Sequence, residues 1–393
     1  MRRLVLCSLL ILFVLLSNTA PAQNDSSCPL RISVLTCSPG QELYSLFGHS
    51  ALRIVDLAKH TDIIYNWGTF EGYGEPDFYL KFMRGKLRYF VSPDKLDDFM
   101  YEYQYDGRSV TEQILDLSCE DKLRIKHAVD SNMLPQNRFY KYDFTFDNCT
   151  TRIRDIIAQN TASLNLPDSL VPAGTTFRNM LYFYLDRGSQ PWSKLGIDIL
   201  LGSKLDKVVT TSQAMFLPEY LMAAIDLSTR DNKTLTGNKR QLLPAQPYGE
   251  MKGIYEPLLI IFAVCLLFFT LSLAKSSTAK RLTRIIDSLL LYLTGLLGFL
   301  LLFMWFFTDH AACADNYNLL WALPPNLIIA FSNKQKQSVR SYFKLTSIVL
   351  LLTITLWLWL PQQLNIAILP LAVYLLYRYI AHAGFSFQKK PQG

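Results

Sequence analysis

Two residues of this sequence, Cys149 and His49, are suited to form a nucleophilic pair. Cys149 lies in the run Asp-Asn-Cys-Thr-Thr-Arg, at the start of a helix predicted over residues 150–159. The positive end of a helix favours a thiolate, and the backbone N–H groups there can hold an oxyanion. His49, in the run Leu-Phe-Gly-His-Ser, lies where a loop enters a strand predicted over residues 51–56. A histidine in that position can take the thiol proton.

A pair of this kind works best with a third polar group that orients the imidazole ring. Asn66 is the candidate, because it lies on the next predicted strand, over residues 62–67. Other interpretations stay open. Cys149 could be half of a disulfide or a buried thiol, and His49 an ordinary surface or core histidine. Asn66 could simply cap a turn before Gly68.

The residues of the region 23–250 do not indicate a metal site. The histidines of this region are His49, His60 and His127, and neither Cys-x-x-Cys nor His-x-x-x-His spacing occurs there. Structural and catalytic zinc sites usually show such spacing. We therefore predict no metal site and no cofactor.

The elements that must position these residues form a compact α+β pattern. Strands and then helices are predicted over residues 51–56, 62–67, 86–91, 93–105, 120–133 and 150–159. Residues 232–247, rich in Lys, Asn, Gly and Pro, are typical of a linker.

The first 22 residues are typical of a cleaved secretory signal. Two arginines precede a short apolar run over residues 4–16, and Ala-Pro-Ala at 20–22 offers a cleavage site. The mature chain therefore meets an oxidising compartment. Five cysteines are exposed to it, an odd number that leaves one thiol free unless two chains pair: Cys28, Cys37, Cys119, Cys149 and Cys313. Cys28 and Cys37 could close a small loop, but the spacing leaves the pairing open.

From residue 257 the chain becomes strongly apolar. Five segments of membrane-helix character follow, over residues 257–274, 285–308, 319–331, 345–360 and 366–380. The third is short and contains Pro324-Pro325, so by itself it would be interfacial or re-entrant. These segments, with the signal, divide the chain into residues 1–22, 23–250 and 251–393.

The basic residues decide the number of crossings. The loops over residues 275–284 and 332–344 each hold four Lys or Arg. Five crossings place both loops in the cytoplasm, as the positive-inside rule requires, whereas four leave the second loop outside. We therefore predict about five spans in an all-α membrane domain. The net charge of +7 gathers in these loops and indicates membrane orientation, not nucleic-acid binding.

The order of the motifs, with His first and Asn-Cys opening a helix, resembles circularly permuted papain-like proteins, such as NlpC-type amidases and the lecithin retinol acyltransferase group. Three stretches narrow the resemblance: Phe-Gly-His-Ser-Ala-Leu-Arg-Ile (47–54), Tyr-Asn-Trp-Gly-Thr-Phe (65–70) and Asn-Cys-Thr-Thr-Arg-Ile-Arg-Asp (148–155). They are similar to the periplasmic domain of Lnb-type lipoprotein N-acyltransferases. Asn-Tyr-Asn-Leu-Leu-Trp (316–321) and the spans around it resemble the transmembrane domain of that family.

This resemblance implies a bacterial inner-membrane enzyme with a permuted papain-like catalytic domain in the periplasm and a cytoplasmic C-terminus. Its partners would be a phospholipid acyl donor and a diacylated lipoprotein acceptor. Cys149 would carry the acyl chain as a thioester, with His49 as its base and Asn66 as the orienting group. Three neighbours are expected to contact substrate: Ser50, Trp67 and Arg152.

Two other functions compete with acyl transfer. The same pair with water as acceptor would make a lipase or a cell-wall amidase, although an amidase would not need five spans. A periplasmic sensor or assembly module would leave Cys149 structural. Nearby aromatic residues could be core or could line an acyl groove, and the pattern does not separate these roles: Trp67, Phe70, Tyr73, Phe78, Tyr79 and Phe82.

Overall fold

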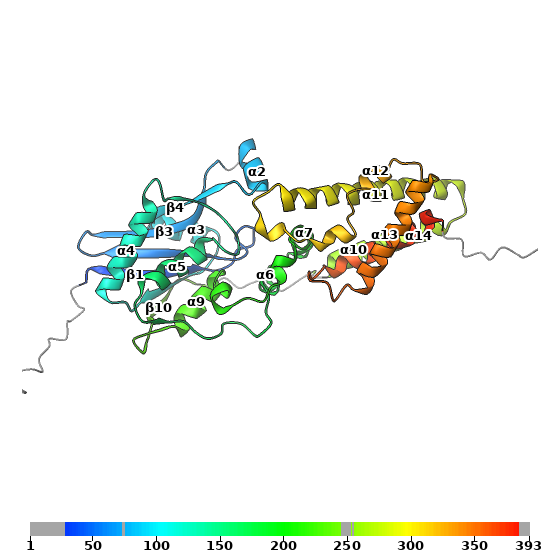
Figure 1. Cartoon of the computed structure of the whole chain (residues 1–393). Coiled ribbons are helices and arrows are strands. Elements are labelled where there is room, and N and C mark those ends of the chain that lie inside the picture. Colours follow the sequence, from blue (N-terminus) through cyan, green and yellow to red (C-terminus); the bar gives the residue numbers. More distant parts are fainter. Residues whose placement is uncertain (1–27, 73–74, 245–252, 254, 385–393) are drawn as a thin grey trace, which may run out of the picture.

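The computed structural model describes residues 28–72, 75–244, 253 and 255–384. The chain forms an α+β domain followed by a bundle of long helices, and the two lie end to end (Figure 1). The predicted signal over residues 1–22 falls outside the described residues, as does Tyr73. The predicted order of an α+β domain before a helical domain is confirmed.

A seven-stranded antiparallel sheet organises the first domain, in the order β10-β5-β1-β2-β3-β4-β6. Its strands are β1 (Leu30–Cys37), β2 (His49–Asp56), β3 (Thr61–Phe70), β4 (Arg88–Lys95), β5 (Val110–Leu115), β6 (Phe139–Lys141) and β10 (Thr236–Leu243). The short strands β7 (Leu164–Asn165), β8 (Thr229–Arg230) and β9 (Lys233–Thr234) form a second sheet. The linker prediction over residues 232–247 is therefore wrong for residues 233–243. Pairing with β5 orders these polar residues as an edge strand, because main-chain hydrogen bonds are indifferent to side-chain polarity.

Helices lie on both faces of the sheet and also at the end of the domain that faces the helical bundle (Figure 1). They are α2 (Pro76–Met83), α3 (Leu96–Tyr105), α4 (Cys119–Met133), α5 (Cys149–Asn160), α6 (Phe177–Arg187), α7 (Pro191–Leu200), α8 (Thr211–Ala214) and α9 (Pro218–Leu227), with a 3₁₀ turn, η2 (Ser203–Asp206). Residues 93–95 belong to β4 and not to the helix predicted over 93–105. They pair with residues 63–65 of β3, and β6 covers only the first residues of β4, so Pro93 meets no strand on its other side.

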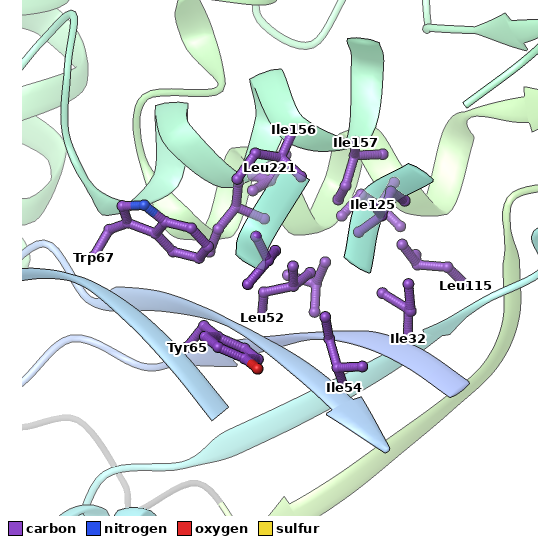
Figure 2. Close-up of a cluster of buried hydrophobic side chains, with 14 of the residues drawn as sticks. Ile32, Leu52, Ile54, Tyr65, Trp67, Leu115, Ile125, Ile156, Ile157 and Leu221 are labelled. Atoms are coloured by element: carbon purple, nitrogen blue, oxygen red, sulfur yellow. The ribbon is translucent and has the colours of Figure 1, made fainter. Parts of the chain in front are cut away.

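The main core lies between the sheet and helices α4, α5 and α9. Figure 2 shows side chains of the strands pointing toward those of the helices, with Trp67 among them. Each fully buried Val, Leu, Ile or Phe contributes about 1.5–3 kcal/mol, so this layer fixes α5 against the sheet. A second cluster, which includes Cys37, lies between the sheet and α3.

One disulfide ties the start of the domain to this core. It joins Cys28, just before β1, to Cys119, the first residue of α4. Cys37 lies at the far end of β1 and is a free, buried thiol. The small loop between Cys28 and Cys37 is therefore not formed, since an extended eight-residue strand separates the two.

The second domain contains α10 (Glu256–Leu273), α11 (Ser277–Phe306), α12 (Asn326–Ile329), α13 (Gln337–Thr355) and α14 (Leu369–Ala383), with 3₁₀ turns η3 (Ala311–Cys313), η4 (Tyr317–Leu320) and η5 (Ile366–Ile368). Among the described residues, three helical stretches are long and apolar enough to cross a membrane: Glu256–Leu273, Ser277–Phe306 and Ile366–Ala383. At the end remote from the first domain, Asp287 of α11 pairs with Arg378 and His382 of α14.

Residues 319–331 are not a continuous helix. They form the turn η4 and the four-residue helix α12, which lie along α11. Two glycines of α11 allow the close approach: a Cβ at Gly298 would lie 2.2 Å from the Ala322 oxygen, and one at Gly295 would lie 2.2 Å from the Leu327 nitrogen. Pro324-Pro325 prevents a longer helix, because proline lacks the N–H that a helix interior requires.

The two domains meet at the C-terminal end of α7. Asn318 donates to the Asp198 carbonyl, Asn316 to the Ile199 carbonyl and Gln362 to the Leu201 carbonyl. These are carbonyls that a helix end leaves without partners. Asn316 and Asn318 are therefore buried at the contact between the two domains, where both donate hydrogen bonds to the first domain. Both side chains hold the second domain against the first.

Candidate active site

Cys149 is the first residue of α5, and the preceding Asn148 caps that helix. The Asn148 side chain accepts from the N–H groups of Thr150 and Thr151, both at 2.9 Å, while the Thr151 hydroxyl accepts from the Asn148 N–H. The Asn148 amide also donates to the Phe144 and Phe216 carbonyls. This capping box fixes the start of the helix and the direction of the Cys149 thiol.

The His49 ring and the Cys149 thiol are hydrogen-bonded to each other. Burial by itself would raise the pKa of Cys149. The positive charge of His49 and its hydrogen bond oppose burial, with help from the Ser50 N–H and the Thr150 hydroxyl, and lower the pKa of Cys149 to about 7. Burial lowers the pKa of His49, but the charge of the Cys149 thiolate and the hydrogen bonding of Cys149 and Asn66 together raise it by more, so the net shift is upward. The pair is therefore poised to hold a thiolate beside an imidazolium.

The local backbone brings His49 to this position. Gly48 has φ +80°, and a Cβ there would lie 2.8 Å from the Cys37 carbonyl oxygen. Only glycine accepts both the left-handed conformation and the close approach. His49 then opens β2, paired in register with Cys37.

Asn66 holds the other side of the imidazole ring. Its Oδ1 lies 3.0 Å from His49 Nε2, and its Nδ2 donates to Asp94 Oδ2 at 2.5 Å. A carboxylate only accepts, so Asp94 fixes which end of the amide faces His49. Oδ1 must then accept from Nε2–H, which leaves Nδ1 of the neutral ring to take the thiol proton.

Asp94 is the functional residue that the sequence reasoning missed. The helix predicted over residues 93–105 includes Asp94, and that prediction does not pair it with the strand of Asn66. In the sheet, Asn66 pairs with Ser92, so Asp94 is its diagonal neighbour on the same face. Residues 92–95, Ser-Pro-Asp-Lys, carry no local strand pattern, so only the pairing of β4 with β3 brings Asp94 to this position.

The three predicted substrate contacts occupy different places. Ser50 lies at the site, where its N–H donates to Cys149 and its hydroxyl accepts from Thr150 at 3.2 Å. Arg152 lies one turn along α5, paired with Asp147 and 4.0 Å from the centre of the Tyr140 ring. Trp67 is 1% exposed and packs in the core (Figure 2).

Gly68 lies next to the Cys149 side chain. It has φ +98° at an irregularity in the pairing of β3 with β4, and a Cβ there would lie 3.9 Å from both the Cys149 Cβ and Tyr142 Cε2. A side chain at position 68 would therefore contact both Cys149 and Tyr142. Among the described residues, no group of three or more His, Cys, Asp or Glu could hold a metal ion.

Comparison with known families accounts for both domains. Residues 21–181, which contain Cys149, His49 and Asn66, match the Lnb N-terminal periplasmic domain, and residues 249–390 match the Lnb transmembrane domain. No curated protein and no solved structure matches the chain. The two matches occur in the order of a periplasmic domain tethered to a transmembrane domain, as in a lipoprotein-modifying enzyme of the inner membrane. The chain therefore belongs to the Lnb family of lipoprotein N-acyltransferases.

Proposed function

We propose that this chain moves an acyl chain from a membrane phospholipid to the N-terminal amine of a diacylated lipoprotein, through a thioester on Cys149. The observation that supports the proposal is the series of interacting side chains Asp94, Asn66, His49 and Cys149, which ends at the first residue of helix α5. Its parts are a nucleophile, a base of defined tautomer and an orienting pair. The permuted papain-like arrangement, with His before Cys, belongs to the same proposal.

In the first half-reaction, His49 Nδ1 takes the thiol proton and the Cys149 sulfur attacks an ester carbonyl of the phospholipid. The N–H of Cys149 is the first of its helix and has no helical acceptor, so it can donate to the oxyanion. Collapse breaks the ester C–O bond, and the imidazolium returns its proton to the departing lysophospholipid oxygen. The acyl chain is then a thioester on Cys149.

In the second half-reaction, the α-amine of the lipoprotein attacks the thioester carbonyl. His49 takes a proton from the attacking nitrogen, the C–S bond breaks, and the thiolate recovers a proton from the imidazolium. The products are an amide and the free thiol. Both substrates are lipids, which explains a thiol domain tethered to a membrane domain.

The proposed setting is a signal removed after Ala22, a periplasmic domain over residues 23–250 and five crossings by residues 251–393. The contacts support this path. The segment after α11 returns along it, from Ala322 beside Gly298 to Phe331 beside Tyr292, where the ring centres are 5.9 Å apart. A cysteine at Ser338, at the start of α13, should resist a membrane-impermeant reagent added outside, while one at the exposed Leu123 should react. Labelling of both would overturn the five-crossing arrangement.

The decisive assay uses the full chain in lipid vesicles with a labelled phospholipid and a synthetic diacyl lipopeptide. An amide product, with a hydroxylamine-sensitive acyl group on Cys149, is the expected result. Free fatty acid as the sole product would make the protein a hydrolase. No acyl group on Cys149 under either condition would favour a sensor or assembly module.

A further inference from the structure

Helix α2 exposes an apolar face that the first domain does not cover. Tyr79, Leu80, Phe82 and Met83 are 55%, 49%, 53% and 41% exposed. At 100° per residue these four share one side of the helix. The opposite side carries the ion pair between Asp77 and Lys81. An eight-residue helix with this division has the pattern of an interfacial membrane helix.

The end of α2 is joined to the end of the spanning helix α11 (Figure 1). The Asp309 N–H donates to the Arg84 carbonyl at 3.0 Å, and His310 Nε2 donates to the Phe82 carbonyl at 2.8 Å. A Cβ at Gly85 would lie 3.1 Å from the Asp309 carbonyl carbon, so the two backbones are in direct contact. The end of α2 is therefore held directly against the end of α11.

Aromatic side chains mark the depth of this junction. Trp305 and Phe306 stack at 4.8 Å at the end of α11, and Phe306 and Phe307 are 64% and 69% exposed. Trp359, just beyond α13, is 76% exposed. Aromatic belts of this kind lie at the level of the lipid headgroups. Asp309 is only two residues beyond Phe307, so α2 lies at the same level.

Basic residues follow the apolar face. Arg84, Lys86 and Arg88 are all exposed, immediately after α2. Their charge complements anionic headgroups, and an apolar face beside basic residues is the usual composition of a segment lying on a lipid surface. The surface therefore fits membrane phospholipid.

A row of aromatic rings leads from α2 to the nucleophile. Consecutive ring centres are 6.4, 5.4, 5.5 and 4.4 Å apart along the series Phe82, Phe78, Phe70, Tyr89 and Tyr142. The last ring lies beside Gly68, which is next to the Cys149 side chain. Of the aromatic residues that the sequence left undivided, Trp67 lies in the core, and Phe70, Phe78 and Phe82 lie on this row. Tyr79 lies on the apolar face of α2, and Tyr73 falls outside the described residues.

We propose that α2 lies in the outer surface of the membrane with its apolar face among the acyl chains, and that the aromatic row guides a phospholipid acyl chain from α2 to Cys149. The second part rests on the proposed function, and the first does not. The arrangement would let a phospholipid bend an acyl ester up to the thiol without leaving the bilayer, so that little apolar surface is exposed to water.

The position of α2 is tested without catalysis. The full chain carrying Cys149→Ala is placed in vesicles of phosphatidylethanolamine and phosphatidylglycerol, with a photo-crosslinking amino acid at Leu80 or, on the opposite face, at Asp77. We expect lipid adducts at position 80 and at least about tenfold fewer at position 77. Equal labelling at both positions, or none at 80, would overturn the proposal whether or not the wild type makes an amide.

The role of α2 in delivery is tested with Leu80→Asp and a matched control, Leu123→Asp on α4, where Leu123 is 55% exposed. We expect Leu80→Asp to slow acylation of Cys149 by bilayer phospholipid at least about tenfold, with an unchanged rate of Cys149 alkylation by iodoacetamide. The control should change neither rate. Normal acylation in Leu80→Asp would refute delivery through α2, while absence of acylation in the wild type would refute the proposed function instead.

Discussion

Two free thiols lie close to His49, and their pKa values are shifted in opposite directions. Cys37 pairs with His49 across β1 and β2, and Cys149 faces the His49 ring from the start of α5. Burial raises the pKa of Cys37 to about 12, despite the nearby Arg108 charge and a hydrogen bond with Tyr103. The pKa of Cys149 is lowered to about 7.

The difference lies in what surrounds each sulfur. Cys37 is fully buried in an apolar cluster between the sheet and α3, while Cys149 is partly exposed and receives hydrogen bonds from His49 and Ser50. A thiolate removed from water forms only where hydrogen-bond donors and a nearby positive charge outweigh the cost of burial. Proximity to a histidine is therefore not sufficient to activate a cysteine.

The largest difference between the two thiols is expected when each sulfur is removed in turn. Cys149→Ala should lower acyl transfer by about 10³-fold or more, because the covalent step is lost. Cys37→Ala, the matched control, should keep activity within about twofold and affect only stability. Product formation is measured in vesicles, with thermal unfolding to confirm that both variants fold. Strong activity in Cys149→Ala would end the assignment of the nucleophile.

Removing the base should have the next largest effect. His49→Ala should slow acylation by about 10²–10⁴-fold, the usual contribution of a general base. The pKa of Cys149 should also rise, since burial would act without the opposing charge. The rate of Cys149 acylation, followed by intact mass, checks this. A double variant with Cys149→Ala should be no slower than Cys149→Ala, and a further large loss would show that the two residues act separately.

The two thiols should also differ in pH dependence. Because the pKa of Cys149 is lowered to about 7, its thiolate is present above that pH and is lost as the pH falls through it. Alkylation by iodoacetamide should therefore fall about 50-fold from pH 7 to pH 5. Cys37 should stay unmodified throughout, since its pKa is raised to about 12. An inflection near pH 9 for Cys149, measured by peptide mass spectrometry, would contradict the thiolate–imidazolium pair.

The sequence predicted the parts of this site that depend on local structure. Asn148 before Cys149 is a helix-cap signal, and the residues after His49 have a strand pattern. The sequence therefore predicted where both Cys149 and His49 lie in the local structure. The role of Asp94 and the polar strand β10 were not predicted, because sheet pairing outweighs local preference in both segments. The Cys28–Cys119 disulfide depends on long-range packing, which spacing cannot reveal.

The remaining predictions concern the groups that orient His49. Asn66→Ala should slow acylation by about 30-fold, since it removes a hydrogen bond to the imidazolium worth about 2 kcal/mol. The effect should fall mainly on kcat, with KM for the phospholipid nearly constant. Asn66→Gln, which keeps the amide on a longer side chain, should restore part of the rate. Full activity in Asn66→Ala would move the orienting role to another residue.

Asp94→Asn should have the smallest effect, about fivefold, because it leaves the Asn66–His49 hydrogen bond possible but no longer fixes the direction of the Asn66 amide. With an amide at position 94, Asn66 can present either Oδ1 or Nδ2 to the ring, and only the first keeps the proton on Nε2. The pKa of Cys149 measured by alkylation should then rise, which a purely structural role for Asp94 would not produce. Asp94→Glu should keep the amide direction and the Cys149 pKa. If Asp94→Asn lowered stability while leaving the Cys149 titration unchanged, Asp94 would be a structural residue of β4, and the proton on His49 would be placed by Asn66 without it.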